Sequence, residues 1–198
     1  MKDKSVINWD TLYKKEAPKL IGVCRRYVGN ISAAYIDNII LLNIKALVTL
    51  TQRLLPVLKK QEKAYILNIA SMASFGPMPY KTVYPASKAF VYSFSRSLYA
   101  ELKGTNVLVS VAHPCGMATN TNVSERINSY NRLIKSTVLS PDSVARICIR
   151  KVLKGKPIII PGIMGKLCWF LLKVLPTQFL LDVFRKSLLK ELKLIHAA

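Results

Sequence analysis

Acidic residues are scarce in this sequence. The 198 residues include 10 Asp and Glu against 30 Lys and Arg, which gives a formal net charge of +20. Such an excess attracts phosphates, nucleic acid or anionic lipid at long range, and by itself it does not choose among them. The sequence shows no nucleic-acid-binding module and no basic stretch interleaved with aromatic residues. We therefore do not expect a nucleic-acid partner.

Cysteine is also sparse and poorly spaced for metal binding. The four cysteines, Cys24, Cys115, Cys148 and Cys168, form no CxxC pair and have no pair of histidines nearby. This pattern excludes the common zinc sites and a disulfide framework, and it favours a reducing, cytoplasmic setting without a bound metal. The charged start "MKDKSVINWD" has no apolar segment typical of a signal peptide.

Glycine is scattered through the chain. A turn that holds a dinucleotide pyrophosphate at a helix N-terminus needs three glycines within a few residues. The eight glycines present are nowhere spaced in that way. The sequence therefore lacks a pyrophosphate-binding turn of this type.

What the sequence does have is enough apolar residues, 51%, for one domain with a substantial core. Apolar residues recur at helical spacing over residues 32–59, with Ser32 as the expected N-cap and a bend or break near Pro56. Further helices are predicted from Tyr84 onward and over residues 140–155. Short apolar runs at residues 64–71, 106–114 and 156–162 predict buried parallel strands. This alternation predicts an α/β, Rossmann-type, doubly wound parallel sheet of three or four strands.

Three regions follow from this pattern: a poorly determined segment, 1–30; the α/β core, 31–163; and an apolar, basic tail, 164–198. Lys173, Pro176 and Asp182 interrupt the tail, so it does not offer the roughly 20 uninterrupted apolar residues of a spanning helix. One or two amphipathic helices are expected there. They would either cover the core or lie on an anionic bilayer surface, and the sequence leaves both alternatives open.

Polar residues gather where the predicted strands end. Ser71 follows the first strand, a small-residue loop "HPCGMATN" follows the second, and the intervening helix carries Tyr84 and Lys88 four residues apart. Asn43 lies inside an otherwise apolar helix, where asparagine is mildly unfavourable. In a parallel sheet, functional groups collect at this edge. Taken singly, each residue could instead be a helix cap, a turn residue or a solvated helix start, and His113 a core histidine.

A lysine beside a tyrosine has a chemical use. A free tyrosine has a pKa of about 10, so it is a poor base at neutral pH. An ammonium within reach stabilises the phenolate and lowers that pKa toward the range that acid–base catalysis needs. Lys88, at i+4 from Tyr84, is placed on the same helix face to do this.

With these motifs in place, residues from about 31 to 165 resemble the C-terminal two-thirds of a short-chain dehydrogenase/reductase, with the 3-oxoacyl and hydroxysteroid reductases as the most similar subgroup. The resemblance implies that Asn43, Ser71, Tyr84 and Lys88 form a catalytic Asn–Ser–Tyr–Lys tetrad. Ser71 would bind the substrate oxygen, Tyr84 would transfer its proton, and Asn43 would hold a water that relays protons to Lys88.

The resemblance also implies a cofactor site. Lys88 would bind the nicotinamide ribose beside Tyr84. The loop residues Pro114, Gly116 and Met117 would meet the nicotinamide ring, and Thr119 would contact the carboxamide or a phosphate. Cys115 stands where the family has its first loop glycine, so Gly116 is expected to supply the backbone freedom. By this resemblance, we expect the given sequence to be without the N-terminal half that would bind the pyrophosphate and select NAD or NADP.

By this resemblance, the chain is expected to transfer a hydride between NAD(P)(H) and a carbonyl or secondary alcohol, on a lipid-like substrate. The long helix and the helix from Tyr84 would form a homodimer interface. The alternative hypothesis is a remnant without catalytic activity that serves as an interaction or membrane-surface module.

Overall fold

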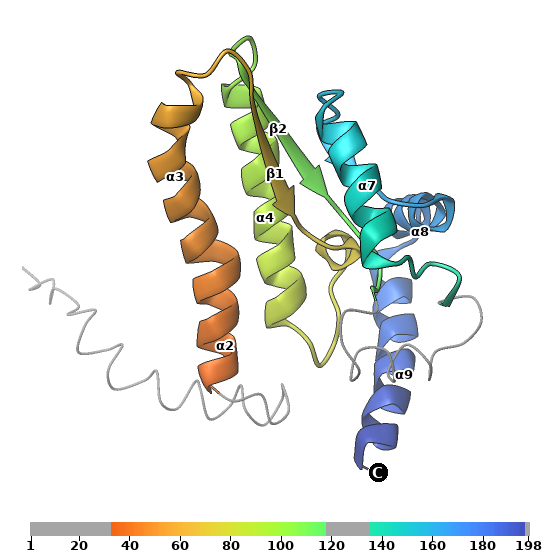
Figure 1. Ribbon diagram of the computed structural model, residues 1–198. Helices are drawn as coiled ribbons and strands as arrows, with labels where there is room; N and C mark the ends of the chain where they lie inside the picture. The colour runs from red at the N-terminus through yellow and green to blue at the C-terminus, as the bar shows by residue number, and fades with distance from the viewer. Residues whose placement is uncertain (1–32, 118–134, 197–198) are drawn as a thin grey trace, which may run out of the picture.

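The computed structural model describes residues 33–117 and 135–196, and all structural statements concern these residues. The described part contains a three-stranded parallel sheet in the order β1-β2-β3, with strands Ala64–Ile69, Val107–Ala112 and Ile158–Ile159 (Figure 1). β1 pairs with β2 from Ala64 opposite Val107 to Ile69 opposite Ala112. β3 pairs with the end of β2, with Val111 opposite Ile158. The predicted parallel α/β fold is therefore confirmed.

Helices cover both faces of this sheet (Figure 1). α4 (Val83–Glu101) packs on one face, where Leu98 and Leu102 meet Ala64, Val107 and Val109. α7 (Pro141–Val152) covers the other face through a buried row of residues, Val144, Cys148 and Val152. The side chains of β1 alternate between these two clusters, as the pleat of a strand requires.

The predicted long helix is present, and its irregularity lies elsewhere than expected. α2 (Ala33–Ile40), a π-helical segment (Leu41–Ala46) and α3 (Leu47–Leu58) form one continuous helical stretch beside α4. Of the predicted bend or break near Pro56, the break is wrong, because α3 continues through Pro56 to Leu58; the bend stays a prediction. A proline this close to a helix end removes only one of the last backbone hydrogen bonds. The predicted N-cap Ser32 lies outside the described residues.

Among the described residues, the stretch Ala33–Leu58 is long and apolar enough to cross a membrane by length and composition alone. A core helix of a soluble protein passes the same test but is mostly buried, whereas many large apolar side chains of this stretch are exposed. In this structure its inner face packs on α4, and Asn106 at the start of β2 donates its side-chain amide to the carbonyl of Leu58.

The tail forms two helices, as predicted. α8 (Ile163–Val174) and α9 (Thr177–His196) are separated at Leu175, whose extended conformation is typical of a residue before proline. α8 packs on the short 3-10 helix η2 (Met72–Phe75), and its Trp169 ring lies 6.4 Å from that of Phe75. Leu180 and Leu188 of α9 are buried. The tail thus covers part of the core.

Candidate functional site

Lys88 is the centre of the predicted site. It lies in the second turn of α4, and its Nζ donates to the main-chain carbonyl of Ile69 at 3.1 Å and to Asn43 Oδ1 at 3.4 Å. The same Nζ lies 5.9 Å from the centroid of the Tyr84 ring. Partial burial lowers the pKa of Lys88, because desolvation disfavours its charged form. The structure therefore brings three of the four predicted tetrad residues together.

Asn43 contributes from the π-helical segment. Its Nδ2 donates to Ser87 Oγ at 3.0 Å, and Ser87 Oγ donates in turn to the carbonyl of Tyr84 at 2.8 Å. π-helical turns are frequent at functional sites because they redirect a side chain that a regular helix would point elsewhere. Asn43 reaches Lys88 directly here, whereas the sequence predicted a contact through water.

Ser71 lies just beyond β1, two residues after the carbonyl that holds Lys88. Its backbone is extended, and its hydroxyl caps η2 by accepting from the Ala73 N–H at 3.2 Å. A cap role and a substrate-binding role are compatible, because a serine hydroxyl can also donate its own hydrogen.

A buried histidine supports the Ser71 loop; its burial agrees with the core position considered from the sequence, whereas its contacts with this loop were not predicted. His113 is fully buried, and its Nδ1 lies 3.1 Å from the Ser71 carbonyl and 2.8 Å from Ser74 Oγ. Its ring packs against Phe75 at 4.4 Å and Tyr92 at 5.0 Å between centroids. Burial lowers the pKa of His113 to about 4, against a smaller raising effect of the Ser71 carbonyl. This histidine is therefore neutral at physiological pH.

The loop after β2 carries the predicted cofactor contacts. The Pro114 carbonyl accepts from the Met72 N–H at 3.1 Å, which joins this loop to the Ser71 loop. Met117 packs against the cluster beneath α7. Thr119 lies outside the described residues.

Cys115 and Gly116, which lie between Pro114 and Met117, differ from expectation. Gly116 was expected to supply backbone freedom, yet it is not in the left-handed region, and a Cβ there would meet Val138 at an ordinary 3.6 Å. Cys115 instead packs toward α8, with its Sγ 3.4 Å from where a Cβ on Gly165 would be. Burial raises the pKa of the Cys115 thiol to about 11, which disfavours the reactive thiolate form.

The sequence of this region matches the family model described as short chain dehydrogenase over residues 22–129, more than half of the chain. The chain belongs to the short-chain dehydrogenase family. The match begins earlier and ends earlier than the resemblance over residues 31–165 expected from motifs, and it includes the entire predicted tetrad. Oxidoreduction with NAD(P) is the general chemistry of this family.

Two curated members are similar to parts of this chain. The very-long-chain 3-oxoacyl-CoA reductase of Anas platyrhynchos is 43% identical over 84 residues, which are 42% of this chain and 27% of that protein. The human 17-beta-hydroxysteroid dehydrogenase type 3 is 38% identical over 94 residues, 44% of this chain and 30% of that protein. The chain thus spans less than a third of the length of these relatives.

Solved structures support the same fold. A 7beta-hydroxysteroid dehydrogenase structure aligns with a TM-score of 0.62 at 20% identity, over 74% of this chain and 56% of that one. A short chain dehydrogenase from Burkholderia cenocepacia in complex with NADP aligns with a TM-score of 0.56 at 19% identity, over 67% and 54%. Both of these proteins are about twice as long as the part that aligns with this chain. The alignment therefore supports the Rossmann-type fold for the aligned portion.

The described residues of this short-chain dehydrogenase fit one half of a dinucleotide. The half-buried Lys88 ammonium and the Tyr84 hydroxyl are donors suited to ribose hydroxyls, and they share the carboxyl edge of the sheet with the loop after β2. The eight glycines of the sequence form no pyrophosphate-binding turn. The nicotinamide side is therefore the part for which this chain has suitable residues.

Proposed function

We propose that the chain is the substrate side of an NAD(P)-dependent oxidoreductase that interconverts a carbonyl and a secondary alcohol. The observation that carries this proposal is the position of Lys88: two oxygen acceptors, from Asn43 and from Ile69, hold its ammonium beside the ring of Tyr84. A solvated lysine at a helix start would not need two fixed acceptors from other elements.

In this mechanism Tyr84 is the acid–base residue. When a carbonyl is reduced, Tyr84 Oη would give a proton to its oxygen; a nicotinamide held by Lys88 and Tyr84 would be the source of the hydride for its carbon. The O–H bond of Tyr84 breaks as the new O–H bond forms, which leaves a phenolate. The Lys88 ammonium stabilises that phenolate more strongly than it would in bulk water, because the site is partly desolvated. Oxidation of the alcohol follows the reverse course.

The other residues have positioning roles. Ser71 would donate a hydrogen bond to the substrate oxygen, and Asn43 would align Lys88 and hold a water that relays protons to it. On the cofactor side, Lys88 and Tyr84 would bind the ribose, while Pro114, Gly116, Met117 and Thr119 would contact the nicotinamide. NAD and NADP are both compatible with these residues, because the groups that distinguish them bind the adenosine ribose.

A lipid-like substrate is the most consistent choice. The relatives that match this region are named for very-long-chain 3-oxoacyl-CoA and for 17-beta-hydroxysteroids, which are both apolar carbonyl or alcohol compounds. We therefore propose a hydrophobic ketone or 3-oxoacyl thioester as the substrate class.

The test is NADPH or NADH consumption with such substrates, using the full chain, Tyr84→Phe, and Tyr99→Phe as a control on the same helix. Removal of one acid–base group is expected to lower turnover by about 100- to 10,000-fold, with unchanged circular dichroism. Tyr99→Phe should keep its activity, because Tyr99 lies at the far end of α4 against Arg96. Equal turnover in folded wild type and Tyr84→Phe would contradict the catalytic assignment.

A second candidate function, an interaction or membrane-surface module without turnover, is favoured by one observation. α8 and α9 expose large apolar side chains beside basic ones: Ile163, Leu167, Phe170, Leu171, Val174, Phe179 and Val183. Titration of NADPH fluorescence separates the two. Enhancement that saturates supports the oxidoreductase, and its absence together with binding to anionic vesicles supports the module.

A further inference from the structure

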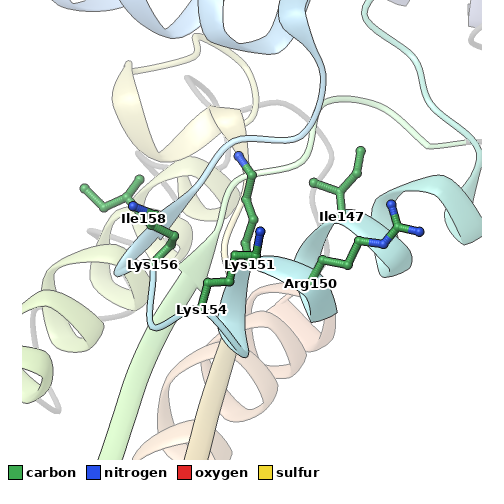
Figure 2. Close-up of a pocket in the computed structure, with 6 residues that line it drawn as sticks. All are labelled: Ile147, Arg150, Lys151, Lys154, Lys156 and Ile158. Carbon is green, nitrogen blue, oxygen red and sulfur yellow. The ribbon is translucent and has the colours of Figure 1, made fainter.

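A second concave site lies at the opposite end of the molecule from Tyr84. Ile147, Arg150, Lys151, Lys154, Lys156 and Ile158 line a cavity of about 410 Å³ at the end of α7 and the start of β3 (Figure 2). Lys156 precedes β3 and, by the register that sets Ile158 opposite Val111, is level with the middle of β2, whereas Ser71 follows the carboxyl end of β1. The candidate catalytic site therefore makes no use of this cavity.

The charge of the lining is of one sign. Four of the six residues are cationic, none is acidic, and the two others are isoleucines. Like charges held close together repel one another, and the apolar isoleucines lower the local dielectric, which strengthens each interaction. A bound anion removes that repulsion. The volume is within the range of small-molecule sites, about 300–1,000 Å³.

The helix dipole accounts for only part of this cluster. Arg150 and Lys151 are in the last turn of α7, where cations favourably meet the negative helix end. The dipole effect fades within one turn, and Lys154 and Lys156 lie beyond the helix. Their positions need a different explanation.

The turn between α7 and β3 fixes these two lysines. Gly155 has a φ of 64°, and its N–H donates to the carbonyl of Val152 at 2.8 Å. The Lys156 N–H donates to the carbonyl of Lys151 at 3.1 Å. These two bonds form a Schellman motif, which needs glycine at its left-handed position. The motif places Lys154 and Lys156 on either side of one rigid turn.

We propose that this cavity binds a ligand through phosphate groups, either a lipid headgroup or a small soluble phosphate. Arg150 offers a planar fork that can bind two phosphate oxygens, and the lysines offer point charges around it. Among common anions, a diphosphate or a phosphomonoester cluster matches a cavity lined by four cations better than a single carboxylate does. The net charge of +20 would steer such a ligand toward the protein.

The experiment compares the full chain with two triple variants of equal charge. The cavity variant carries Lys151→Gln, Lys154→Gln and Lys156→Gln. The control carries Lys59→Gln, Lys60→Gln and Lys103→Gln, at exposed positions outside the cavity lining. Calorimetric titration with pyrophosphate should show binding that the cavity variant weakens at least about tenfold and the control changes less than about twofold. Equal weakening in both variants would mean diffuse attraction only and would overturn the proposal.

Two further measurements complete the test. Vesicle binding identifies the source of the phosphate group, and NMR of the wild type does not depend on a variant that could misfold. Vesicles of phosphatidylcholine with a phosphoinositide, compared with vesicles of equal charge made with phosphatidylserine, test the lipid headgroup. Preference for the phosphoinositide that the cavity variant loses and the control keeps indicates the lipid source, and equal binding to both kinds of vesicle indicates a soluble phosphate. In the wild type, pyrophosphate should shift the NMR amide signals of Gly155 and Lys156. Absence of any such shift, or of all binding in both arms, would refute the site.

Discussion

At the scale of single residues, His113 couples folding to pH. Its folded pKa of about 4 lies below the ordinary value of 6.5. Between these values the unfolded chain binds a proton that the folded chain does not. The stability contribution of neutral His113 is therefore complete above pH 6.5 and is lost as the pH falls toward 4. The full shift corresponds to about 3 kcal/mol.

His113→Asn tests this coupling, since asparagine can donate to the Ser71 carbonyl but does not titrate. Urea unfolding at pH about 7 and about 5 should show a larger loss of stability for the wild type than for His113→Asn. Carboxylates also titrate at the lower pH, and the comparison between the two proteins cancels their effect. Parallel losses in both proteins would show that His113 is not the group responsible.

At the scale of secondary-structure elements, the tail covers part of the core, and its membrane-surface role stays a prediction. Leu180 and Leu188 are buried, while Phe170 and Val174 on α8 are 56% and 61% exposed. Deletion of the tail would therefore remove core contacts along with any membrane-binding face, so it cannot test the latter alone.

A substitution of the exposed face is the cleaner test. Phe170→Ser with Val174→Ser should reduce co-sedimentation with anionic vesicles at least about tenfold, because each side chain loses about 1.5–3 kcal/mol of burial in the lipid interface. Ile149→Ser with Leu153→Ser, both 53% exposed on α7, is the matched control. If the two pairs lose binding equally, or if neutral vesicles bind as well, α8 has no specific membrane role.

The elements also show which features the sequence could predict. Strands β1 and β2 and the helix α7 were expected at nearly their observed bounds, because apolar runs and the Ser140 cap are local signals. The π-helical segment around Asn43 was not expected. Its side-chain partner, Ser87, is 44 residues away, and local periodicity does not report such contacts.

Some features of the candidate site could likewise be predicted from the sequence, and others could not. The spacing of Tyr84 and Lys88 predicted a shared helix face, and the structure confirms their proximity. The roles of Ser74 and His113 could not be predicted, because they depend on two loops that meet only after the strands pair. Serine and histidine at those positions look like ordinary loop and core residues.

At the scale of the whole molecule, one face of the long helix is open. Large apolar side chains on it are exposed: Tyr35, Leu42, Leu50, Leu54 and Val57. Apolar patches of this kind commonly mark interfaces between subunits. We expect a homodimer in which two copies of this helical stretch and of α4 pack together.

Light scattering at micromolar concentration should give the mass of a dimer or larger species for the wild type. Leu50→Glu with Leu54→Glu should give a monomer, because an interface cannot bury four unpaired carboxylates without a large cost. Ile149→Glu with Leu153→Glu introduces the same charge on α7 and should leave the mass unchanged. A monomeric wild type would contradict the dimer.

The hydrogen bond from Lys88 to the carbonyl of Ile69 bears on how the sequence can vary. Every amino acid supplies a main-chain carbonyl, so the acceptor at position 69 survives any substitution that keeps the strand paired. Asn43, the other acceptor, depends on its side chain. Substitutions at position 69 should therefore leave this acceptor of Lys88 in place, whereas substitutions of Asn43 should remove the other acceptor. The position of the Lys88 ammonium thus depends partly on the pairing of the strands and only partly on which side chains are present.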